Sequence, residues 1–363
     1  MRRPPARAPG LFLALMASLA APASAQEDAG GSPSSGLYAV PFVIYSPETS
    51  WIFGIGAAGF YRAAGDSTLK PSSYAASIQY SIKGQYVFNP SAQLYFDGER
   101  SLFETEVELT RSFESYYGVG NESPGLDEPL YEVRRIRARA EYLRRIGPLY
   151  VGPFAEYSDE ALRDPRENPL LLDQSAPGQE YTQEIGAGVV LLYDARDRVY
   201  SPTEGTLARL RMVGYAEWLG SDGGFRWLEA DLRHYRPLGD NQVFAFQLFF
   251  EGTGGDVPFF RLPTPGGEDL MRGIRRGRYR DRVSLVAQSE FRTDLFWRIG
   301  AAVFGSVGEV APSVGSIALN RFRHTVGAGL RYTVDEKEKL KVRIDYGVGP
   351  GTDGFYLTVD EAF

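Results

Sequence analysis

Cysteine is absent from the 363 residues, and histidine occurs only twice. The lack of cysteine excludes a disulfide framework, thiolate metal sites and cysteine nucleophiles. The two histidines, His234 and His324, are far apart and indicate no metal-ligand cluster. They are also the only candidate imidazole bases, and the chain has no Gly-x-Ser-x-Gly nucleophile elbow. The sequence therefore predicts no catalytic residues, no metal site and no cofactor.

Lysine is scarce as well, since only five of the 39 basic residues are lysines and the other 34 are arginines. Arginine suits fixed, bidentate pairing in partly dry sites, although a GC-rich genome would give the same bias. The 46 acidic residues bring the net charge to −7. A general nucleic-acid-binding protein would present a basic surface, so we expect no nucleic-acid partner.

Long hydrophobic runs are missing after residue 25, where no stretch reaches the ~20 apolar residues of a transmembrane helix. Residues 1–25 read as a cleaved export signal, with a basic start, the short apolar core LFLALMASLAA, and Ala23-Ser24-Ala25 as the cleavage site. Residues 26–36 are expected to form a flexible linker. If the exported chain is a membrane protein, residues 37–363 form a β-barrel.

Alternation of apolar and polar residues predicts strands throughout residues 37–363. In FAFQLFFEGTG, for example, Phe244, Phe246 and Leu248 share one face, and Ala245 and Gln247 the other. Sixteen such segments begin near Leu37, Trp51, Ser73, Gln85, Arg100, Tyr131, Leu149, Tyr181, Thr206, Phe225, Val243, Val283, Trp297, Phe322, Lys339 and Gly354. Because closure is the arrangement that removes sheet edges, we expect an all-β, 16-stranded antiparallel barrel.

The polar faces indicate a barrel that crosses a membrane. Glu104, Glu106 and Glu108 share one face of their segment, and arginines occupy one face of the next, RRIRARAEYLRRI. Opposite charges on neighbouring strands can pair across a lumen while the apolar faces contact lipid. The 44 tyrosines and phenylalanines gather near segment ends, as interface aromatics do. Aromatic packing in a soluble sandwich is the alternative.

The segment LMRGIRRGRYRD, Leu270 to Asp281, places five arginines and two glycines between the eleventh and twelfth predicted strands. A cationic loop held in a fixed position needs an acidic host. On the twelfth strand, Glu290 lies on the same face as Gln288 and Arg292. The loop therefore has a candidate carboxylate close by.

Sixteen strands, this Arg-Gly loop and the C-terminal aromatic together resemble the BamA and TamA superfamily of outer-membrane proteins, also called the bacterial surface antigen family. The segments YDARDRVYSPTEGT, DLRHYRPL, PGGEDLMRG and GAGLRY match the family's style, and the resemblance covers residues 37–363. In the last segment, Phe355, Leu357 and Phe363 share one parity, similar to the signal that such proteins present to their assembly machinery. The resemblance implies a bacterial outer-membrane location and a loop inserted into the lumen.

Two departures from the family pattern shape the expected loop latch. Ile274 stands where the family has an aromatic, and the stretch 304–308 lacks the family's aspartate on the thirteenth strand. We therefore expect Arg272 and Gly273 to form the latch, with Glu290 as the main partner of Arg272 and Ser306 as a secondary one. The alternative for the loop, chiefly for its other arginines, is a solvated tip that attracts lipopolysaccharide phosphates. Those arginines are Arg275, Arg276, Arg278 and Arg280.

The resemblance implies assisted insertion or translocation of client proteins, or of lipids, through a seam between the first and last strands. Pro41 removes one hydrogen-bond donor from the first strand, consistent with a weak edge. Expected partners are outer-membrane lipids and lipopolysaccharide, nascent outer-membrane proteins, or a separate periplasmic subunit. Eleven linker residues are too few for the periplasmic POTRA modules of the family, so we expect a barrel-only branch. A passive pore or structural barrel is the alternative, followed by an outer-membrane hydrolase.

Overall fold

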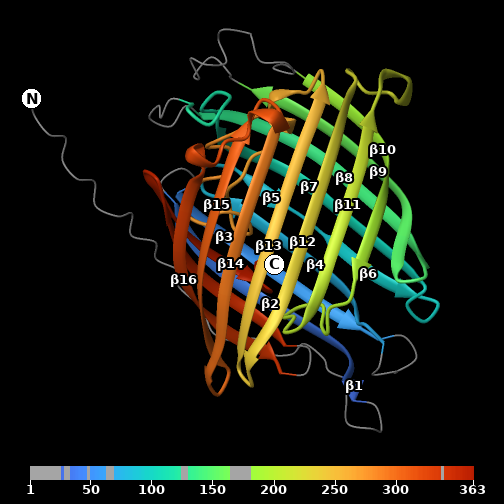
Figure 1. Cartoon of the computed structure of the whole chain (residues 1–363), viewed down its shortest axis with the longest axis vertical. Coiled ribbons are helices and arrows are strands. Elements are labelled where there is room, and N and C mark those ends of the chain that lie inside the picture. Colours follow the sequence, from blue (N-terminus) through green and yellow to red (C-terminus); the bar gives the residue numbers. More distant parts are fainter. Residues whose placement is uncertain are drawn as a thin grey trace, which may run out of the picture.

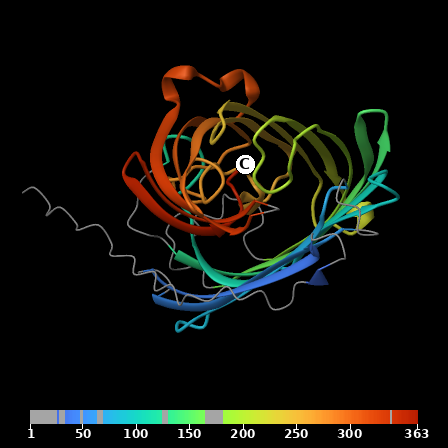
Figure 2. The same cartoon turned by 90° about the horizontal axis from the view of Figure 1, so that it is seen from below.

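The computed structural model describes residues 26–27, 33–46, 50–62, 69–123, 130–163, 181–336 and 339–363, and the expected export signal at 1–25 lies outside them. The described residues form one antiparallel sheet that curls around a lumen (Figures 1 and 2). None of the helices among them is long and apolar enough to cross a membrane.

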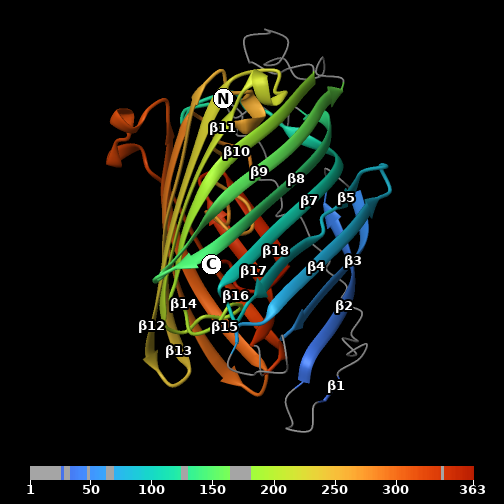
Figure 3. The ribbon, with the colours of Figure 1, turned by 90° about the vertical axis from the view of Figure 1, so that its right-hand side faces the viewer.

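The strands follow one another around the sheet in chain order. They are β1 (Gln26–Glu27), β2 (Pro33–Ser46), β3 (Ser50–Tyr61), β4 (Ser72–Ser81), β5 (Tyr86–Phe88), β6 (Ser91–Phe96), β7 (Ser101–Ser115), β8 (Leu130–Ile146), β9 (Leu149–Arg163), β10 (Tyr181–Asp194), β11 (Gly205–Tyr215), β12 (Phe225–Gly239), β13 (Gln242–Gly255), β14 (Val283–Phe296), β15 (Ile299–Ala311), β16 (Arg323–Asp335), β17 (Leu340–Gly349) and β18 (Thr352–Val359). Four 3-10 turns lie in the connections: η3 (Glu217–Leu219), η4 (Phe259–Arg261), η5 (Val314–Ser316) and η6 (Leu319–Arg321). The connection that contains η5 and η6 projects sideways from the rim (Figure 3).

These strands occupy sixteen successive positions around the sheet, which we call staves, as the sequence predicts. Strand β1 has only two residues, and β5 and β6 lie end to end between β4 and β7. All predicted starts except the first fall within two residues of an observed start. The expected linker at 26–36 needs correction, because β2 begins at Pro33 and Gln26 pairs with Ser35. Backbone pairing there extends the sheet before Leu37.

Burial is inverted relative to a soluble protein. On β13, Phe244 and Leu248 are exposed on the outside, whereas Ala245 and Gln247 are buried inside. The inward positions of β14 are buried too: Val286, Gln288, Glu290 and Arg292. Apolar side chains outside and polar ones inside are expected of a barrel that contacts lipid.

Ion pairs fill much of the lumen. Arg139 on β8 pairs with Glu106 on β7 at 2.5 Å, across neighbouring strands as expected. Arg209 on β11 spans the lumen instead, reaching Glu104 on β7 at 2.5 Å and Glu141 on β8 at 2.6 Å. Charged side chains therefore also join strands that are not neighbours in the sheet.

The first and last staves are the two edges of the sheet. Residue pairings join β1 to β2 and every neighbouring pair of staves up to β17–β18, and none joins β18 to β2 among the described residues. The C-terminal strands curve inward, and the chain ends inside the ring of strands (Figure 2). The seam at which the barrel would close lacks a hydrogen-bonded ladder in this structure.

Phe363 corrects a sequence-based expectation. It does not continue the face of Phe355 and Leu357, because β18 ends at Val359 and the chain turns at Asp360, whose φ is 79°. Phe363 is buried inside the lumen in a cluster with Tyr235, Ala245 and Ala362, which is partly lined by Val243. Alternation of faces holds only within a strand, and Phe363 lies beyond the end of β18.

We expect Arg209→Met to destabilise the barrel by about 3 kcal/mol, because it leaves the carboxylate of Glu104 without its guanidinium and Glu141 with that of Arg211 alone. Arg144→Met is the matched control, since Arg144 forms an exposed pair with Asp97 and such pairs contribute less than about 1 kcal/mol. Urea unfolding of the detergent-folded protein, followed by tryptophan fluorescence, measures both changes. Equal effects of the two substitutions would contradict a stabilising role for the cross-lumen pairs.

Candidate functional site at the arginine loop

The connection between β13 and β14, residues 256–282, folds back into the lumen. Its base is closed where Thr253 N–H donates to the carbonyl of Arg282 at 2.8 Å. Met271, Ile274 and Tyr279 of the loop are buried in one cluster with Val286 and Val310 of the wall. Ile274, which replaces the aromatic of the family pattern, thus anchors the loop by apolar packing. The loop is inserted into the lumen, as predicted.

Arg272 lies in an ion cluster at the centre of the loop. Its Nη2 forms an ion pair with Glu290 on β14, and its Nη1 lies 2.5 Å from Asp345 on β17. All three side chains are almost fully buried. The guanidinium also stacks on Phe304, with its central carbon 3.5 Å from the ring centroid. The structure therefore brings Arg272 and Glu290 together and adds Asp345, which the sequence analysis missed.

Further arginines surround the same two carboxylates. Arg331 on β16 lies 3.0 Å from Glu290 and 2.5 Å from Asp345. Arg343 lies 2.8 Å from Asp345 and also pairs with Asp269 of the loop, again at 2.8 Å. Buried charges are tolerated when they are paired and hydrogen-bonded in this way, whereas removing one partner typically costs about 3–5 kcal/mol. The cluster links the loop to three strands of the wall.

Ser306 is not part of this cluster. Its hydroxyl shares a 2.5 Å hydrogen bond with the hydroxyl of Thr325, on the neighbouring strand β16. The two residues are direct cross-strand partners, so the hydroxyls meet without the loop. The expectation of a secondary contact with Arg272 was wrong for this reason.

Gly273 rests on the last two strands. Its N–H donates to the hydroxyl of Tyr356 on β18 at 2.9 Å, and the hydroxyl of Thr352 donates to its carbonyl oxygen. Its φ is 110°, and an added Cβ would lie 2.6 Å from the backbone nitrogen of Val348. Both the backbone conformation and the close approach therefore require glycine. Tyr356 and Thr352 were missed, although their parity opposite to Phe355 places them on the inward face.

The residues after β18 are held by the same ion cluster. Glu361 lies 3.0 Å from Arg331, and Arg292 donates to the backbone oxygen of Phe363 at 2.8 Å. Burial raises the pKa of Asp360, which begins this turn, to about 7. Since Arg292 and Arg331 also pair with Glu290, the loop and the C-terminal residues share their partners.

The four remaining loop arginines divide into two groups. Arg275 and Arg276 are exposed, in keeping with a solvated tip. Arg278 donates to the hydroxyl of Ser123 at 2.8 Å, and the buried Arg280 donates to the carbonyl of Phe259 at 3.1 Å. The solvated-tip alternative therefore does not describe these two residues, because Arg278 fastens the loop to Ser123 and Arg280 holds the η4 part of the loop itself.

The other candidate residues lie on the wall or its outer face. Pro41 sits in β2 opposite Ile55, and Phe355 and Leu357 are partly exposed on β18. His234 and His324 are both exposed, and His234 is hydrogen-bonded to the hydroxyl of Thr206. Within the described part of the chain, no three histidine or acidic side chains are grouped closely enough to hold a metal ion.

Comparison with known proteins identifies relatives of this barrel. A family model described as the Omp85 superfamily domain matches residues 131–363, more than half of the chain. The solved structure of BamA from Haemophilus ducreyi lacking POTRA domains 1-3 matches with a TM-score of 0.57 and 13% identity, over 91% of this chain and 70% of that one. No curated protein matches.

Two further solved structures have the same fold. CdiB from Escherichia coli matches with a TM-score of 0.55 and 13% identity, over 90% of this chain and 62% of its own. CdiB from Acinetobacter baumannii gives 0.53 and 13%, over 95% of this chain and 65% of its own. The chain thus spans less than two thirds of either CdiB chain.

We expect Arg272→Lys to loosen the loop while the barrel stays folded. Lysine keeps the charge but lacks the two-pronged guanidinium that reaches Glu290 and Asp345 at once. Hydrogen exchange of residues 271–281 should speed up about tenfold, equivalent to about 1.4 kcal/mol of lost local stability. Arg276→Lys, at an exposed loop position, is the control. Unchanged exchange in Arg272→Lys would show that the ion cluster does not hold the loop.

We expect Gly273→Ala to displace the loop from β17 because the new Cβ collides with Val348. Gly120→Ala is the matched control, since Gly120 has a similar φ of 103° but open space around its Cβ position. Both variants incur backbone strain of about 1–2 kcal/mol, so any additional loss in Gly273→Ala reports the collision. Thermal unfolding measures the difference, and equal losses would argue against close contact.

Proposed function

Because the chain belongs to the Omp85 superfamily, whose barrels are outer-membrane proteins, we propose that it assists client insertion or passage through a seam between β2 and β18. The clients are nascent outer-membrane proteins or lipids. A separate periplasmic subunit is a further candidate partner. Lipopolysaccharide and other outer-membrane lipids surround the barrel.

The observation that carries this proposal is the pair of strand edges at the seam. No residue pairing joins β2 to β18 in the described chain, so the β18 edge and the β2 edge beyond the β1 pairing at Pro33 and Ser35 present backbone N–H and C=O groups without a ladder. Such an edge is a template for a client strand, which adds by β-augmentation. Pro41 withholds one donor from the β2 edge and so weakens any direct closure with β18.

The position of the arginine loop supports a regulated seam. Gly273 is hydrogen-bonded to Tyr356 and Thr352, both on the seam strand β18. Arg272 is held by Glu290 on β14 and by Asp345 on β17. These contacts of the loop fix the position of β18, and a change in the loop moves β18 relative to β2.

The competing functions receive less support. A passive pore needs an open lumen, whereas the inserted loop and the cross-lumen pairs of Arg209 occupy it. A hydrolase would use one of the two histidines as its base. His234 and His324 are exposed side chains, outside the buried polar clusters of the lumen.

Cysteine crosslinking tests the seam directly, because the chain has no cysteine of its own. When the seam closes, pairs that combine position 42 or 43 of β2 with position 355 or 357 of β18 should crosslink on oxidation. In cells depleted of the native protein, each variant should restore the outer-membrane protein and lipid profile when reduced and fail to do so when oxidised. The matched control joins Val43 to Phe53, which already pair between β2 and β3.

Full function of the oxidised β2–β18 barrel, with crosslinking shown to be complete, would exclude a gating seam. Loss of function in the oxidised β2–β3 control as well would attribute the defect to oxidation itself. A narrow loss of particular barrels on depletion supports protein insertion, and an altered lipid profile supports lipid handling.

A further inference from the structure

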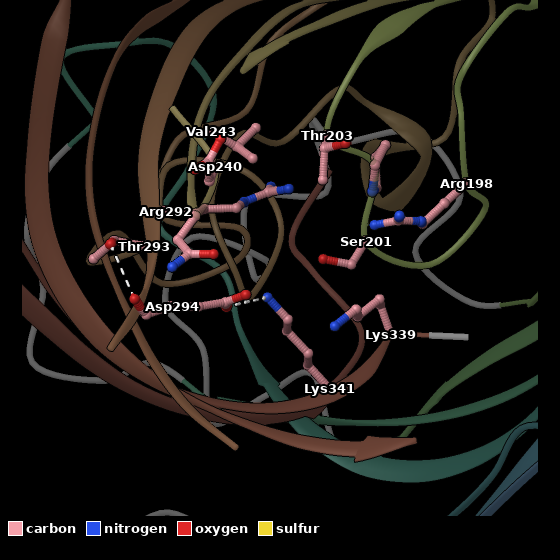
Figure 4. A pocket seen from close by; sticks show the side chains of 12 residues that line it. Arg198, Ser201, Thr203, Asp240, Val243, Arg292, Thr293, Asp294, Lys339 and Lys341 are labelled. Atoms are coloured by element: carbon pink, nitrogen blue, oxygen red, sulfur yellow. Dashed lines mark hydrogen bonds and ion pairs between the residues drawn. The ribbon is translucent and has the colours of Figure 1, made fainter. Parts of the chain in front are cut away.

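A polar pocket lies at one mouth of the barrel, beside the C-terminal end of β14 (Figure 4). It has a volume of about 260 Å³, close to the lower end of the ~300–1,000 Å³ typical of ligand sites. Its walls come from the β10–β11, β12–β13 and β16–β17 connections and from the end of β14. Four segments that are distant in the sequence therefore form one site.

Cations outnumber anions in this pocket. Arg198, Arg292, Lys339 and Lys341 line it, against the carboxylates of Asp240 and Asp294. Figure 4 shows the two lysine amines and the Arg198 guanidinium directed toward the same space, with the Ser201 hydroxyl between them. This placement is notable in a chain with only five lysines and a net charge of −7.

Two of these cations have hydrogen-bonding capacity to spare. Arg292 is only 4% exposed, and its Nη1 is buried without a hydrogen-bond partner in the described structure. A buried guanidinium nitrogen left unsatisfied is costly, which favours an acceptor that completes it. Lys339 forms no ion pair with any described residue, and its φ of 56° is unusual for a lysine. Lys341 lies 3.2 Å from Asp294, which neutralises part of its charge.

The arrangement of donors selects among anions. A planar carboxylate can be satisfied by one guanidinium fork. Here guanidinium, ammonium and hydroxyl donors come from different walls, which suits a tetrahedral oxyanion with several charged oxygens. The pocket volume leaves room for more than the oxyanion itself.

We propose that this pocket is a binding site for a phosphate-bearing ligand, either a soluble phosphate compound or the headgroup of a phospholipid. Arg292, Lys339 and Lys341 contact the phosphate oxygens, and Arg198 and Ser201 close the site from the facing wall. The site adjoins the ion cluster of Arg272 through Arg292, which also pairs with Glu290, but it does not depend on the function proposed above.

Lys339 and Arg198 are the residues to vary. Arg292 and Lys341 also lie near Glu361, at 3.6 and 3.7 Å, so changing them would disturb the C-terminal turn. Arg198 has only a 3.9 Å contact with Asp197. The double variant Lys339→Gln, Arg198→Gln therefore removes two pocket charges with little effect on folding. The single variant Arg226→Gln, at an exposed position near the other mouth, is the charge control.

The test uses the full chain folded in an uncharged detergent at constant ionic strength, with pyrophosphate as the soluble probe in isothermal titration calorimetry. A second arm uses the same titration with short-chain phosphatidylglycerol as the lipid probe. Short-chain phosphatidylcholine is titrated for comparison. We expect saturable binding in at least one arm, weakened about tenfold or more in the double variant and less than about twofold in Arg226→Gln.

Binding of pyrophosphate assigns the site to soluble phosphate compounds, and binding of phosphatidylglycerol alone assigns it to a lipid headgroup. No saturable binding at millimolar concentration in either arm overturns the proposal. Equal weakening in the double variant and in Arg226→Gln overturns it too, because that result means attraction by overall charge. Unchanged thermal unfolding of the double variant shows that any loss of binding is local.

Discussion

The buried pairing of Arg272 with Glu290 and Asp345 is the constraint on which the rest of this structure depends. Neither carboxylate could remain charged in a dry lumen without guanidinium partners, and Arg272 could not enter the lumen without them. The loop must therefore fold inward for the cluster to be complete. The strands β14, β16 and β17 must in turn place Glu290, Arg331 and Asp345 together around Arg272.

The same cluster joins two parts of the molecule that the chain order keeps apart. Arg331 pairs with Asp345 and Glu290 near the loop and with Glu361 beyond β18. Gly273 meets β18 through hydrogen bonds and β17 through backbone contact. A side chain between those backbones would separate them, so the approach depends on glycine. The loop and β18 are consequently expected to move together, which suits a barrel that opens between β18 and β2.

Sequence reasoning worked where the relevant interaction is local or repeats along the strand. Alternation has a period of two whatever the partner strand is, so the sixteen staves and their inward faces could be read directly. Glu290 could be nominated because it follows the loop on an inward-facing position. Phe363 was misplaced because parity holds only while the strand continues, and the turn at Asp360 ends it.

By itself, the sequence determined the all-β class and the number of staves. It also determined the apolar outer and polar inner faces and the Arg-Gly loop that enters the lumen. Each of these depends on residue order over a few positions. Only the tertiary structure decided that Asp345 joins Glu290 as a partner of Arg272, that Tyr356 accepts the Gly273 N–H, and that β18 and β2 are unpaired. Those outcomes depend on how far the sheet curls before its ends approach. Curvature accumulates over all the strands, and no short segment encodes it.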